Sequence, residues 1–199
     1  MRFPIAFVLA LALVLDGTSA NAGVITFDTV ESIDTQFGPS YTEAGFTFTS
    51  DIVSPEAFAA WGSSNPNYTG SPALFRNFDN GQTTMAQGGL AFSLLSIGLS
   101  EVFNQQSYNP TAVTFSAAVF GGGTASQTFN LDLLFGYQTF TFSPAFDNIT
   151  SVSWLQTADY HQFDNIVVGS PVPEPSSILL IGTGLAGVVA ARKRRKQQA

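Results

Sequence analysis

Residues 112–134 read AVTFSAAVFGGGTASQTFNLDLL and contain the clearest local fold signal in the chain. Two segments rich in Val, Thr and Phe, residues 112–120 and 126–134, flank the glycine-rich residues 121–124. Glycine adopts the positive φ angles that tight turns need, and β-branched and aromatic residues favour strands. The sequence therefore predicts an antiparallel hairpin here.

Strand signals continue outward from this hairpin, with turn residues between them. They lie at residues 24–28, 45–49, 90–102, 135–142, 149–156 and 162–169. In residues 90–102 the apolar alternation slips at 94 and 95, as a β-bulge would give, and a helix is the competing interpretation. Residues 50–80 are rich in Pro, Gly, Ser and Asn and predict a long loop region, of the kind in which binding often occurs.

These strands predict an all-β fold, an antiparallel jelly-roll-like β-sandwich, because hairpin signals are frequent and no helical period is visible. A β-barrel is the second choice. The tripeptide Phe-Asp-Asn occurs at 78–80, 146–148 and 163–165, at uneven spacing. We interpret the three copies as similar turns at strand edges, not as sequence repeats.

The first 22 residues are typical of a secretory signal peptide, which we expect to be helical. Arg2 supplies the basic start, residues 5–15 are apolar, and Ala20 and Ala22 form an A-x-A cleavage site before Gly23. The expected partners are the Sec translocon and signal peptidase. An uncleaved N-terminal anchor is less favoured, because the apolar run is short and a good cleavage site follows it.

The charge of the chain changes when its two ends are set aside. The full chain carries −7, but residues 23–170 hold one basic residue, Arg76, against twelve acids, a net charge of −11. Nucleic acid is therefore not an expected partner, since phosphate binding needs a basic surface. The absence of cysteine excludes disulfides, catalytic thiols, thiolate zinc sites and iron–sulfur clusters.

The last 29 residues have three parts. A Pro-Val-Pro-Glu-Pro stretch at 171–175 precedes a predicted transmembrane helix at 176–191 and a basic tail at 192–199. The basic residues that stop the helix on the cytoplasmic side are Arg192, Lys193, Arg194, Arg195 and Lys196. The uncharged run is shorter than the ~20 residues of a usual spanning helix, so local thinning of the bilayer or snorkelling of the basic side chains is required.

This tail resembles the PEP-CTERM sorting signal of Gram-negative bacteria. The residues that match the motif are Val172, Pro173, Glu174 and Pro175. The resemblance implies cleavage by a membrane-embedded exosortase, after an inner-membrane intermediate, and a final place at the cell surface or outside the cell. It also implies a setting of extracellular polysaccharide or biofilm matrix. The alternative is a C-terminal anchor that is never cut.

The expected domains are thus a signal peptide at 1–22, a β-sandwich at 23–170 and a sorting tail at 171–199. The central part also looks like the β-sandwich bodies that often precede this tail, which implies no defined activity. We expect no catalytic residues, because His161 is the only histidine and no Gly-x-Ser-x-Gly elbow is present. The expected function is that of a non-enzymatic structural or adhesive protein, and a secreted hydrolase is a remote alternative.

A carbohydrate- or calcium-binding module is the nearer alternative. For calcium, the expected ligands are Asp28, Glu43 and Asp164, because a first strand beside the last would bring Asp28 and Asp164 together. For carbohydrate, the expected residues are Trp61, Tyr68 and Tyr108, aromatic residues in loop-like segments rich in Asn, Gln and Ser. The competing interpretations are ordinary surface acids, and aromatic residues that close the ends of the sandwich.

Overall fold

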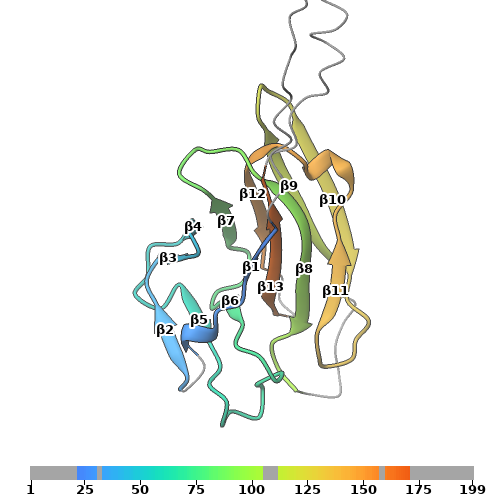
Figure 1. The fold of residues 1–199 in the computed structure, drawn as a ribbon. Helices are drawn as coiled ribbons and strands as arrows, with labels where there is room; N and C mark the ends of the chain where they lie inside the picture. The colour runs from blue at the N-terminus through green and yellow to red at the C-terminus, as the bar shows by residue number, and fades with distance from the viewer. Residues whose placement is uncertain (1–21, 31–32, 105–111, 157–159, 171–199) are drawn as a thin grey trace, which may run out of the picture.

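The computed structural model describes residues 22–30, 33–104, 112–156 and 160–170, which form two antiparallel sheets packed face to face (Figure 1). Sheet A contains β1 (Gly23–Ile25), β2 (Thr35–Phe37), β5 (Phe58–Ala60), β6 (Leu74–Arg76), β8 (Ser93–Glu101), β11 (Gln138–Thr141) and β13 (His161–Gly169). Sheet B contains β3 (Ser40–Glu43), β4 (Phe46–Ser50), β7 (Gln82–Ala86), β9 (Ala112–Val119), β10 (Thr124–Asn130) and β12 (Ile149–Leu155). The prediction of an all-β antiparallel sandwich is confirmed.

The strands are ordered β11-β8-β13-β6-β5-β2 in sheet A, with β1 also paired to β13, and β10-β9-β12-β7-β4-β3 in sheet B. From β6 onward the chain crosses between the sheets at almost every connection, and only β9 and β10 are consecutive in the same sheet. Two short 3₁₀ turns, η1 (Asp28–Val30) and η2 (Pro144–Phe146), interrupt the strands.

The predicted hairpin is present as β9 and β10, which pair from Thr124↔Ala118 to Asn130↔Ala112. Gly121, Gly122 and Gly123 all have positive φ, and Val119 donates its N–H to the Gly123 carbonyl at 3.1 Å. The second strand ends at Asn130, four residues earlier than expected. Residues 131–137 instead form the connection from sheet B to sheet A.

The segment 90–102 forms a strand, β8, and not the competing helix. Leu94 and Ser96 face the consecutive residues Val168 and Val167 of β13, so Leu95 is an extra residue at this point. This irregularity lies where the apolar alternation slips in the sequence.

Five strands were not predicted: β2, β3, β5, β6 and β7. Two of them, β5 and β6, lie inside the expected loop region 50–80 and are three residues long. All three residues of each are buried, so neither shows the alternation of a half-buried strand.

The interior is filled mainly by aromatic side chains. Trp154 on β12 joins two groups of rings, since its ring lies 5.2 Å from that of Phe115 and 5.0 Å from that of Phe163. Phe163 also packs on Phe27 and Phe48, and Phe115 packs on Phe129 and Phe142. These edge-to-face, tilted and stacked contacts make one continuous core between the sheets.

The three Phe-Asp-Asn tripeptides share a backbone feature. Asn80, Asn148 and Asn165 have φ of 54°, 56° and 49°, the left-handed conformation that asparagine tolerates better than most residues. The first two precede strands β7 and β12, as the interpretation of strand-edge turns requires. The third lies within β13, where the register with β8 shifts after Asp164.

Both ends of the described body meet at one place, because β1 pairs with β13 from Gly23↔Val168 to Ile25↔Ile166. The expected signal-peptide helix, apart from residue 22, and the expected transmembrane helix at 176–191 lie outside the described residues. Among the residues that are described, none belongs to a helix long and apolar enough to cross a membrane.

Candidate functional site

A second aromatic cluster lies apart from the main core, on the outer face of sheet A. Leu74 of β6 points into the main core, and its neighbour Phe75 belongs to this second cluster. The Trp61 ring packs on Phe75 at 4.9 Å and lies 6.2 Å from Phe103, which in turn lies 6.1 Å from Tyr160. The aromatic side chains on this face thus come from strand β6 and from the connections that follow β5, β8 and β12.

A small hollow of about 210 Å³ opens beside Trp61. Trp61 and Phe75 form its aromatic wall, and its polar lining residues are Asp34, Thr35, Gln36 and Asn77. Trp61 is half-buried, and its indole Nε1 donates to the Val102 carbonyl at 3.2 Å, which fixes the ring. A fixed aromatic face beside amide and hydroxyl groups suits the apolar and polar faces of a sugar ring.

The wall of this hollow is built by two close contacts. Asp34 accepts hydrogen bonds from the Gly62 N–H at 2.7 Å and from Asn65 Nδ2 at 2.8 Å. A Cβ atom at Gly62 would lie 2.5 Å from the Ile33 carbonyl carbon, so only glycine fits there without movement. The carboxylate of Asp34 therefore holds the connection after Trp61 in place.

The far end of the same connection is tied to a buried acid. Ser71 donates its hydroxyl to Asp164 Oδ2 at 2.6 Å, and Asn165 Nδ2 donates to the same oxygen at 2.8 Å. Burial raises the pKa of Asp164 to about 7, and the charges of Asp28 and Glu43 add to the rise. Sequence reasoning had no signal for the Ser71 contact, because 93 residues separate the partners.

The predicted carbohydrate residues do not all converge. Trp61 lines the hollow, but Tyr68 is not among its lining residues. Tyr68 lies near Tyr137 instead. Burial is the main cause that raises the pKa of Tyr137, and the nearby Asp164 and Tyr68 raise it further. Tyr108 falls outside the described residues. Phe75, Phe103 and Tyr160 complete the aromatic surface and were not predicted.

The predicted calcium ligands lie in one region, as the β1–β13 pairing requires. Both Glu43 oxygens, however, accept protein hydrogen bonds, from the Phe27 N–H at 2.9 Å and the Tyr41 hydroxyl at 2.7 Å. Asp28 accepts one from Thr26 at 2.8 Å. Within the described parts of the chain, no three His, Cys, Asp or Glu side chains are grouped as a metal site needs.

His161 lies inside the sandwich and is fully buried. Burial lowers its pKa to about 3, so the imidazole is neutral at physiological pH. In the part of the chain that the structure describes, neither ring nitrogen has a hydrogen-bond partner. A general base must reach the proton that it removes from a nucleophile. Among the described residues, His161 makes no hydrogen bond to such a nucleophile.

No curated protein matches the chain by sequence. Among solved structures, the fold is similar to a family 29 carbohydrate-binding module complexed with mannohexaose, at 13% identity and a TM-score of 0.45, covering 77% of this chain and 94% of that chain. A second structure of a family 29 module shows 11% identity and a TM-score of 0.44, with 77% of this chain and 90% of that chain covered. A likeness this distant assigns no ligand to the chain.

One sequence profile matches, and it covers the segment that follows the described body. It describes the PEP-CTERM protein-sorting motif and matches residues 171–195. The match begins right after Ser170, where the described part of the sandwich ends. The resemblance noted from the tail is thereby confirmed: the chain carries a PEP-CTERM protein-sorting motif at its C-terminal end.

Proposed function

We propose that this chain is an exported surface protein, processed by an exosortase, whose β-sandwich has a non-enzymatic structural or adhesive role. The observation that carries the proposal is the sorting motif at 171–195, which indicates export and sorting to the cell surface. In this proposal the Sec translocon exports the chain and signal peptidase cuts before Gly23. The tail then holds the protein in the inner membrane until the exosortase cuts near Pro173-Glu174-Pro175.

The connectivity of the body supports a jelly roll. Its last eight strands fall into the order β6-β13-β8-β11 in one sheet and β7-β12-β9-β10 in the other. A chain that alternates between two four-stranded sheets in this way forms two interlocked Greek keys.

The sorting step is tested by replacing Glu174 with alanine in the native host. We expect Glu174→Ala to leave the full-length chain in the membrane, since the acid between two prolines is the charged part of the motif. Mass spectrometry of the mature C-terminus reports the cleavage position and any attached group. Glu56→Ala, a change at an exposed acid of the body, is the control and should be processed as the native chain.

Normal release of the Glu174→Ala protein would contradict exosortase recognition of this motif. A native protein from intact cells that still ends in its Arg-Lys cluster would make the tail a simple anchor.

Carbohydrate binding at the hollow beside Trp61 is the second candidate. It is supported by the fixed, half-buried indole and by the amides of Gln36 and Asn77 in the same hollow. Trp61→Ala should lower the affinity for a bound polysaccharide by about tenfold, the factor expected for loss of one aromatic contact. Trp61→Phe should keep most of it. Equal binding by native and Trp61→Ala proteins on a glycan array would remove this site.

Calcium binding by Asp28, Glu43 and Asp164 stays a prediction. One Asp164 oxygen, Oδ1, is buried without a hydrogen-bond partner among the described residues, which leaves it able to bind a cation. If calcium ties the first and last strands together, excess EDTA should lower the melting temperature and added Ca²⁺ should restore it. A melting temperature that EDTA does not change would end the idea.

A further inference from the structure

An apolar groove lies at the end of the sandwich where the two ends of the body meet. Its volume is about 690 Å³, and its floor includes Ile25, Phe46 and Val168. Three apolar side chains from three different segments stand exposed around it: Val24 at 51%, Leu90 at 65% and Phe120 at 58%. None of the described residues that line the groove carries a charge.

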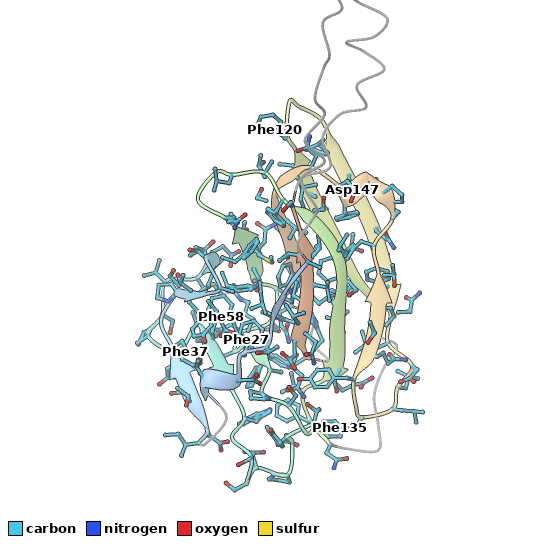
Figure 2. The ribbon with its side chains drawn as sticks, in the orientation of Figure 1. Phe27, Phe37, Phe58, Phe120, Phe135 and Asp147 are labelled. Carbon is cyan, nitrogen blue, oxygen red and sulfur yellow. The ribbon has the colours of Figure 1, made fainter. Side chains whose placement is uncertain are left out.

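Phe120 marks this end of the molecule in Figure 2, and Phe135 marks the opposite end. Phe120 begins the glycine-rich turn between β9 and β10, which extends past the ends of the neighbouring strands (Figure 1). The groove thus lies at one tip of an elongated sandwich, and large apolar side chains project there into solvent. Exposed apolar groups gathered at one place mark an interaction surface.

The position of the tail limits what this tip can meet. Ser170 lines the groove, and the apolar run of the tail starts at Ile178. The eight steps along the chain from Ser170 to Ile178 can span at most about 29 Å, at ~3.6 Å per step. While the tail is held in the inner membrane, as the proposed function requires, the groove cannot lie farther than this from the bilayer surface. A tether this short gives a weak contact a high effective concentration.

The charge of the body selects the face that can approach lipid. Residues 23–170 carry a net charge of −11, and a bilayer surface that contains anionic phospholipids repels such a body. The lining of the groove is free of charge, so desolvating it against lipid costs no buried ion. The acid Asp147, which directly follows η2, also lies at this end of the molecule (Figure 2).

We propose that the rim of this groove, formed by Val24, Leu90 and Phe120, docks on the phospholipid surface while the tail holds the chain in the membrane. The three side chains enter the interfacial layer, and the sandwich stands with this tip toward the bilayer. The docked body would present the cleavage segment, which starts one residue after Ser170, at a fixed height above the membrane. After cleavage the tether is lost, and a three-residue apolar rim is too weak to retain the body.

The absence of cysteine makes a clean test available, since one introduced cysteine is the only labelling site. The full-length protein is placed in vesicles of phosphatidylethanolamine and phosphatidylglycerol, with an environment-sensitive fluorophore on Thr124→Cys, beside the glycine-rich turn. Nitroxide-labelled phospholipid should quench this fluorophore. The same fluorophore on Leu134→Cys, an exposed position in the connection after β10, should be quenched much less.

The rim is then removed by the triple change Val24→Ser, Leu90→Ser and Phe120→Ser. The equilibrium constant for docking, obtained from the quenching at position 124, should fall by about tenfold or more, the factor for withdrawing even one large apolar side chain from lipid. The matched control changes three exposed apolar residues that do not line the groove, Val53, Leu134 and Leu155, to serine and should leave quenching unchanged.

Each other outcome overturns the proposal, and two of them name another occupant of the groove. Equal quenching at both labels means that the body has no fixed tip toward the lipid. A fluorescence shift without quenching, abolished when residues 171–175 are replaced by a Gly-Ser linker, means that the tail segment fills the groove. A shift that grows with protein concentration means a second copy. If the full chain does not float with the vesicles, the membrane-held step of the proposed function itself is contradicted.

Discussion

The groove at the tail end and the hollow beside Trp61 differ in how they are made. The groove is apolar, uncharged and open, and its walls come from strand ends and turns. The hollow is about a third of that volume and has an aromatic wall, with an acid that already holds two hydrogen bonds. Among the described residues, nothing packs on the exposed side chains of the groove, whereas the side chains of the hollow are fixed by contacts between residues far apart in the sequence.

The groove therefore suits nonspecific association with an apolar surface, and the hollow suits selective binding of one ligand. An apolar rim binds any apolar layer and distinguishes poorly between them. A fixed indole beside amides can distinguish one hydroxyl arrangement from another, because unpaired polar groups are costly in such a place. One sandwich therefore provides two surfaces, and the changes described below disturb one, the other or both.

Trp154→Ala is expected to have the largest effect, because it removes the ring that joins the two halves of the core. A large buried aromatic changed to alanine costs about 3–5 kcal/mol of unfolding free energy. Both surfaces should be lost together in a single urea transition, followed by tryptophan fluorescence and by a label at the groove. Two separate transitions would mean that the groove and the hollow belong to independent folding units.

Asp164→Asn should change the pH dependence of stability for the whole body, since the groove and the hollow are expected to unfold together. Burial raises the pKa of Asp164 to about 7, so the folded protein keeps a proton that the unfolded chain releases near pH ~4. The unfolding free energy should therefore fall between about pH 4 and pH 7 and stay level above. At about 1.4 kcal/mol per pKa unit the total is on the order of 3–4 kcal/mol.

The difference between the native and Asp164→Asn proteins isolates this group, because His161 acts in the opposite direction. Its pKa is lowered to about 3, so its contribution to stability is lost as the pH falls below ~6.5. Asp79→Asn, at an exposed turn acid, is the control. If urea titrations at a series of pH values show the same curve for native and Asp164→Asn proteins, the buried acid is not the cause.

Gly62→Ala should damage the hollow and leave the groove intact. The new Cβ would lie 2.5 and 2.6 Å from backbone atoms of Ile33 and 2.7 Å from the Asp34 nitrogen, which forces the Trp61 connection away from the segment before β2. Overpacking of this kind costs about 1–3 kcal/mol. Gly38→Ala is the matched control, since no atom lies within 4 Å of its added Cβ. Thermal melts that show equal losses for both variants would mean that Gly62 is not tightly packed.

The sequence predicted those features of the fold that depend on the local chemistry of a few neighbouring residues. Glycines 121–123 marked the β9–β10 turn because their conformation is a property of the residues themselves, and the alternation slip near Leu95 marked an irregular strand. It missed β5 and β6, because strands buried on both faces carry no period. The closeness of Asp28 and Asp164 followed from the pairing of the first and last strands, which was expected from the fold class.

The remaining parts of both surfaces come from long-range packing. Trp61 was predicted as a carbohydrate-binding residue in a loop, but Phe75, Phe103 and Tyr160 joined it only through the packing on the outer face of sheet A. The groove combines residues 23–25, 87–91 and 168–170 with Phe120, and no local pattern shows that these lie together. Its position beside Ser170 is a consequence of the β1–β13 pairing, which also places Ser170, the last residue before the tail.

The smallest effect is expected for Leu90→Ser, and that smallness is itself informative. Leu90 lies in the connection between β7 and β8 and is 65% exposed, so its side chain adds little to the folded state. A surface change of this kind should alter the unfolding free energy by no more than about 0.5 kcal/mol in urea titration. Phe46→Ser, at the buried floor of the same groove, is the contrast and should cost several times more. If Leu90→Ser is as costly as Phe46→Ser, then the rim is part of the core, and its exposed side chains no longer need a partner such as lipid to explain them.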